Sequence, residues 1–112
     1  MNHLVAEVKQ FLSWCRPKLG LRGRIRVKLT MREIVHGRQA TFGYYDPATR
    51  EIVVCVRDRH PTDCLRTLAH ELVHLAQGSA RTLTSEDGET GSDIENQANA
   101  VAGILMRLWN QR

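Results

Sequence analysis

Two histidines one helical turn apart limit the fold of this chain more than any other feature of its sequence. They are His70 and His74, and they lie in residues 67–77, TLAHELVHLAQ. At about 100° per residue, the neighbouring apolar side chains fall within one arc and the histidines point nearly the opposite way. This pattern predicts an amphipathic helix over residues 61–77, ended by Gly78. Residues four apart share a helix face, so both imidazoles can bind one metal ion. The apolar arc is Leu65, Leu68, Leu72, Leu75 and Ala76.

Glu71 completes the pattern HExxH. Its carboxylate is expected beside the metal rather than on it, where it can take a proton from metal-bound water. Because the metal lowers the pKa of that water toward neutrality, a nearby carboxylate suffices as general base. The simpler interpretation of the pattern is two helix-surface histidines with an incidental glutamate.

A catalytic zinc ion needs a third protein ligand and an open position for water. No histidine follows His74, so a downstream carboxylate has to serve, unless an upstream histidine loops back (His3, His36 or His60). The first candidate is Glu95, 21 residues past His74 in the first turn of a predicted helix. Its alternative role is structural, because residues 92–95, SDIE, fit a capping box. Weaker candidates lie in or beside a loop: Glu86, Asp87, Glu89 and Asp93.

Together these residues resemble the small gluzincins of the ImmA/IrrE type. That family pairs an HExxH helix with a later E-x-x-A-N-type helix, and here Glu95 is followed by Ala98 and Asn99. Residues 43–54 and the run TLAHEL also resemble SprT-like and phage metallopeptidase domains, although the third histidine of the SprT pattern is missing. The resemblance covers about residues 40–108. It implies a minimal zincin whose substrate adds a strand to the sheet edge beside the active-site helix.

Composition predicts one globular domain of 112 residues, with 42% hydrophobic and 25% charged residues. The three cysteines are odd in number, lack CxxC spacing and lie in apolar segments, so we expect reduced, mostly buried thiols in a cytosolic protein. No apolar run reaches transmembrane length and no signal-peptide pattern begins the chain. We therefore expect a cytoplasmic protein without a membrane partner. The cysteines are Cys15, Cys55 and Cys64.

The hydrophobic periodicity predicts an α+β fold with a small, mainly antiparallel, three-stranded sheet. The last two strands form a hairpin, and the final helix has a core stripe of Ile94, Ala98, Val101, Leu105 and Leu108. In chain order, the expected elements are a helix over about residues 3–15 ended by Arg16-Pro17, strands over 23–30, 39–45 and 51–56, the histidine helix, a loop over 78–92 and a helix over 93–109.

The strand expected at residues 23–30 alternates strictly between apolar and basic side chains. A basic strand face can contact nucleic acid or an acidic partner. The simpler interpretation is a solvated face whose like charges discourage edge-to-edge pairing. We favour the simpler one, because no aromatic side chain is interleaved to stack on bases. The basic residues are Arg22, Arg24, Arg26 and Lys28.

Three more side chains near the expected cleft have two interpretations each. Tyr44 and Tyr45 occupy adjacent, opposite-facing positions, so one of them can donate a hydrogen bond to a developing oxyanion or pack at the sheet rim. His60 can line the site, or it can cap the helix that follows.

The sequence thus predicts a zinc-dependent peptidase, with endopeptidase activity favoured over exopeptidase activity. Zinc is held by His70, His74 and Glu95, and Glu71 is the general base. The alternative is a metal-stabilised module that binds nucleic acid or a protein, with a structural or vestigial zinc site. A third hypothesis is metal-dependent hydrolysis of a non-peptide bond.

Overall fold

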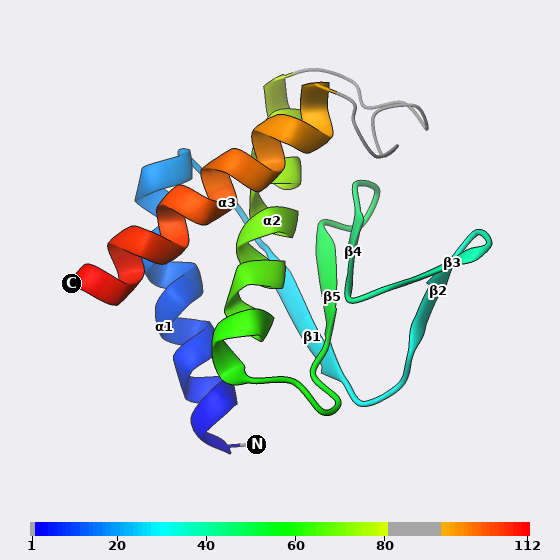
Figure 1. The fold of residues 1–112 in the computed structure, drawn as a ribbon. Coiled ribbons are helices and arrows are strands. Elements are labelled where there is room, and N and C mark those ends of the chain that lie inside the picture. The colour runs from blue at the N-terminus through cyan, green and yellow to red at the C-terminus, as the bar shows by residue number, and fades with distance from the viewer. Residues whose placement is uncertain (1, 81–92) are drawn as a thin grey trace.

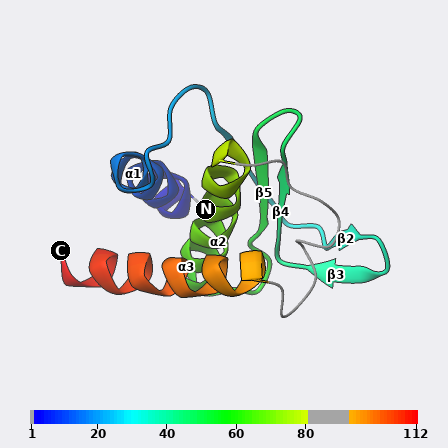
Figure 2. The same ribbon diagram turned by 90° about the horizontal axis from the view of Figure 1, so that it is seen from above.

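Three helices pack on one face of a short sheet in the computed structural model, which describes residues 2–80 and 93–112 (Figure 1). The α+β fold is as predicted. Seen from above, α1 and α3 lie on either side of α2, and the sheet separates the helices from a projecting hairpin (Figure 2). The elements are α1 (Asn2–Leu19), β1 (Arg26–Thr30), β2 (Ile34–His36), β3 (Gln39–Thr41), β4 (Gly43–Asp46), β5 (Glu51–Cys55), α2 (Pro61–Ala80) and α3 (Asp93–Gln111).

The main sheet has the strand order β1-β5-β4, and β2 pairs with β3 in a separate hairpin. Two of the three pairings are antiparallel, β4 with β5 and β2 with β3, whereas β1 runs parallel to β5. The strand expected over residues 39–45 divides into β3 and β4, because the chain bends at Phe42. At this bend Thr41 Oγ1 donates a hydrogen bond to the Gly43 carbonyl at 3.0 Å. β2 was not predicted. The strand expected from residue 23 begins at Arg26, since Gly23 adopts a φ of +80°.

Two helices run further than predicted. Pro17 does not end α1, which continues to Leu19 and closes at Gly20 (φ +65°). There the Leu21 N–H donates to the Arg16 carbonyl at 2.9 Å, as in a Schellman motif. Gly78 likewise does not end α2, which continues to Ala80. In both cases one helix-breaking residue near a helix end has less effect than the packing of the whole element.

The core lies around α2, which is covered by α1, α3 and the sheet (Figure 2). The predicted leucine arc is buried, and Phe11 and Trp14 of α1 meet Trp109 of α3 with ring centroids 5.0 and 5.3 Å apart. This aromatic cluster corrects the stripe predicted for α3, because Trp109 is buried whereas Leu108 is 43% exposed. The buried face of α3 is Ala98, Ala102, Leu105, Met106 and Trp109.

The remaining surface and thiol predictions agree with the structure where it describes them. The apolar side chains of β1 pack toward the core. The four predicted basic side chains are exposed, and two of them, Arg26 and Lys28, lie in β1. The three cysteines are buried and free. None of the helices in the described part of the chain has the length and apolar character to cross a membrane.

Candidate metal centre

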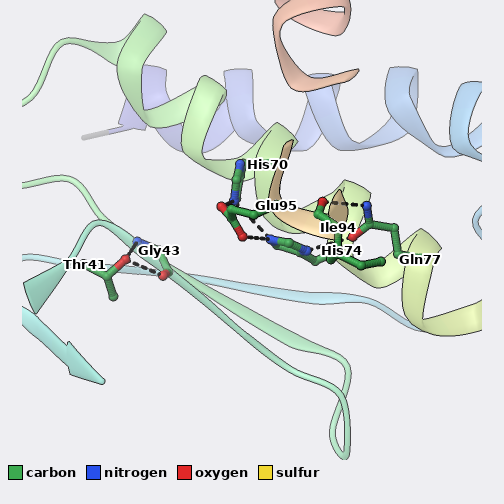
Figure 3. Close-up of polar contacts among 7 residues, drawn as sticks. All are labelled: Thr41, Gly43, His70, His74, Gln77, Ile94 and Glu95. Carbon is green, nitrogen blue, oxygen red and sulfur yellow. Dashed lines mark hydrogen bonds and ion pairs between the residues drawn. The ribbon is translucent and has the colours of Figure 1, made fainter. Parts of the chain in front are cut away.

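The side chains of His70, His74 and Glu95 converge between α2 and α3 (Figure 3). One carboxylate oxygen of Glu95 lies 2.7 Å from His70 Nε2, and the other lies 3.1 Å from His74 Nε2. The two Nε2 atoms are 3.0 Å apart. Within residues 2–80 and 93–112, this is a group of three side chains whose ligand atoms all lie within 4.8 Å of one another, as one metal ion requires.

The donor set fits a divalent cation. A carboxylate oxygen only accepts hydrogen bonds, so a metal ion placed between it and an imidazole lone pair would turn a repulsive contact into an attractive one. Tetrahedral zinc with bonds of about 2.0–2.1 Å places its ligand atoms about 3.3 Å apart. The separations of 2.7–3.1 Å are a few tenths of an ångström shorter, so small side-chain rotations would admit the ion. Burial lowers the pKa of His70, which favours the neutral imidazole that binds metals.

The sequence of α3 explains how Glu95 reaches the histidines. Glu95 lies one turn before Ala98 on the same helix face, and Ala98 and Ala102 are buried against the rest of the core. Because these side chains are small, α3 can approach α2 closely enough for a carboxylate to span the gap. Asp93 is exposed and belongs to no such group. Ser92 and the loop carboxylates Glu86, Asp87 and Glu89 lie outside the described residues, as does most of the loop expected at 78–92.

Glu71 is not part of that group, and its side chain lies against β4, the edge strand of the main sheet. It is buried, and this burial, with a smaller contribution from the charge of Glu95, raises its pKa to about 8. A carboxylate with such a pKa is matched to accepting a proton near neutral pH. Its neighbour on the sheet is Gly43, where an added Cβ would lie 3.4 Å from Glu71 Oε2. The side chain of the predicted base therefore lies beside β4.

Gly43 is a residue beside the candidate site whose close packing the sequence analysis missed. A Cβ at this position would lie 2.5 Å from Thr67 Cγ2, closer than side chains approach. Thr67 has little freedom to move, because its hydroxyl accepts a hydrogen bond of 2.8 Å from Arg59. Only glycine therefore lets β4 lie directly against the turn of α2 that carries Glu71. The isolated glycine within a predicted strand was the available signal for such a close approach.

We expect Gly43→Ala to destabilise the fold by about 1–3 kcal/mol, the usual cost of an extra methyl group in a packed site. It should also reduce any activity that depends on Glu71. Urea denaturation measures the first effect. Gly103→Ala is the matched control, since a Cβ there meets nothing within 4 Å and alanine favours a helix. Equal stability of the two variants would contradict the close approach.

The structure shows where the three side chains with two interpretations lie, His60, Tyr44 and Tyr45. His60 caps α2, because its Nδ1 accepts a hydrogen bond from the Thr62 N–H at 3.1 Å, and it takes no part in the metal-ligand group. Tyr45 packs against the core, and burial raises its pKa. Tyr44 lies on the opposite face of β4. His3 is exposed on α1, so it does not loop back to the site.

Gln77 is the second residue that the sequence analysis missed. It is buried, and its side chain contacts His74 Nδ1 at 2.9 Å and the Ile94 carbonyl at 3.0 Å (Figure 3). Residues three apart on a helix are neighbours, so the spacing from His74 to Gln77 was the available signal.

Comparisons of this chain with protein-family models, with curated proteins and with solved structures give no match.

Proposed function

We propose that the protein is a zinc-dependent peptidase of minimal size, of the zincin type. The observation that supports this most is the convergence of His70, His74 and Glu95. Glu71, which directly follows His70 on α2, is buried. The HExxH spacing alone supplies the two histidines. The third ligand comes from a different helix, which gives the catalytic arrangement of two histidines and a carboxylate.

A bound zinc ion would make a water molecule a better nucleophile and polarise the carbonyl that it attacks. The residues of the chain do the rest. Glu71 removes a proton from the attacking water and then delivers it to the leaving amine. In the metal-free chain, burial raises the pKa of Glu71 to about 8, which favours the uptake of a proton by this carboxylate. The turn beside Gly43 holds its carboxylate at the side of the site that faces the sheet.

The substrate is proposed to lie along β4, the edge strand beside α2. The Cys55 N–H donates to the Phe42 carbonyl at 2.8 Å, and hydrogen-bonded pairs alternate along an antiparallel ladder. The backbone groups of Gly43 and Tyr45 consequently face away from β5, and the Thr41 hydroxyl contacts those of Gly43. An extended peptide could pair with that side of β4, which would bring its backbone past Glu71.

The test of the metal centre is zinc content, measured on protein purified without added zinc. We expect about one zinc per chain in the wild type, and a sharply reduced content in Glu95→Ala. Asp93→Ala is the matched control, because Asp93 is an exposed carboxylate in the same helical turn. Zinc retained in Glu95→Ala would move the third ligand to another carboxylate. No zinc in the wild type would refute the proposed peptidase.

A further inference from the structure

Gln77 lies outside the HExxH pattern and yet contacts both helices of the candidate metal centre. Its side-chain oxygen is 2.9 Å from His74 Nδ1. Its side-chain nitrogen is 3.0 Å from the Ile94 carbonyl and 2.7 Å from Gln97 Oε1. The residue is only 8% exposed, so these bonds have little competition from water. Every polar atom of this buried amide is thus engaged.

The donors and acceptors of this network allow one orientation of the amide. The Ile94 carbonyl can only accept a hydrogen bond, so the NH₂ group of Gln77 has to face it. The carbonyl oxygen of Gln77 therefore faces His74. An oxygen of this kind only accepts, so the hydrogen of the neutral imidazole has to reside on Nδ1. His74 Nε2 is left with a lone pair, and it is the atom that faces His70 and Glu95.

The same amide holds the helix of the third ligand. Ile94 directly precedes Glu95, and Gln97 lies in the next turn of α3. Both hydrogen bonds join α2 to the first turns of α3. One side chain thereby orients one ligand and anchors the backbone beside another.

We propose that Gln77 is a positioning residue, which fixes His74 in the Nδ1–H form and so presents Nε2 to zinc. The role of Gln77 in zinc binding rests on the proposed metal centre. The assignment of the His74 tautomer rests only on the hydrogen bonds of Gln77 and does not depend on zinc. Groups that orient metal-binding histidines typically change metal affinity by about 10–100-fold when they are removed.

The experiment combines ring ¹⁵N NMR of the zinc-free protein with zinc affinity from chelator competition. For the wild type at a pH where His74 is neutral, we expect the Nδ1–H form. Gln77→Leu removes both acceptor and donor, so we expect a loss of that preference and about 10–100-fold weaker zinc binding. Gln77→Glu keeps an acceptor for Nδ1–H, so it should retain the tautomer and recover most of the affinity.

Gln97→Ala is the matched control. It removes one hydrogen bond between the helices without touching His74, so the tautomer and the zinc affinity should stay close to those of the wild type. A purely structural role for Gln77 predicts instead that Gln77→Leu and Gln77→Glu lose the same affinity. An Nε2–H form in the wild type would also overturn the inference. A wild type that holds the Nδ1–H form but binds no zinc would refute the metal centre and leave the tautomer assignment standing.

Discussion

Glu71→Gln is expected to lower kcat by about 10²–10⁴-fold, the usual contribution of a general base, while the zinc content stays at the wild-type level. Glutamine keeps the size of the side chain but cannot take up a proton. The Glu71 carboxylate is not one of the converging ligand atoms, so its replacement should leave the ligands in place. Turnover of a fluorescence-quenched peptide library measures the first effect, and elemental analysis measures the second.

Glu33→Gln is the matched control, because Glu33 is an exposed glutamate outside the metal-ligand group. Substantial turnover in Glu71→Gln would show that another group is the base. A wild type that binds zinc and cleaves no peptide would favour the alternative hypothesis, in which the metal stabilises a binding module. In that case the exposed basic side chains of β1 would become the first surface to examine.

The parts of the site that could be predicted are those set by local helix geometry. His70 and His74 share a helix face at any HExxH sequence, so their convergence follows from spacing alone. Glu95 was predicted in another way, from the absence of a later histidine and from its place at the start of a helix. The structure brings it to 2.7 Å from His70 Nε2. Its small neighbours, Ala98 and Ala102, are the local feature that permits this approach.

The parts that were missed depend on contacts between distant segments. Trp109 replaces Leu108 in the buried face of α3 because Phe11 and Trp14 of α1 offer it aromatic partners. The contact of Gly43 with the turn of Glu71 joins a strand to a helix 28 residues later in the chain. No periodicity within either segment contains that information. The parallel pairing of β1 with β5 is of the same kind, because it places the last strand between two earlier ones.

The contribution of Glu71 to the stability of the zinc-free protein is expected to fall as the pH rises from about 4.5 to about 8. Its pKa is raised from 4.5 to about 8 in the folded chain, mainly by burial and then by the charge of Glu95. Below pH 4.5 the carboxyl is protonated in both the folded and the unfolded chain. Between the two pKa values the unfolded chain gains stability by ionising Glu71, and the folded chain does not.

Each pKa unit corresponds to about 1.4 kcal/mol, so the total loss amounts to a few kcal/mol above pH 8. Glu71→Gln removes this ionisation. Urea denaturation of the two zinc-free proteins should therefore give similar free energies of unfolding near pH 4.5, and a gap in favour of the variant that widens up to about pH 8. All other ionisable groups are present in both proteins, so the gap isolates Glu71. Parallel pH profiles would contradict the buried, proton-retaining carboxyl.

Added zinc should narrow the gap, since a cation beside Glu71 stabilises its ionised form. The burial that suits Glu71 to accept a proton near neutral pH thus costs the metal-free fold stability in the pH range where the base would work.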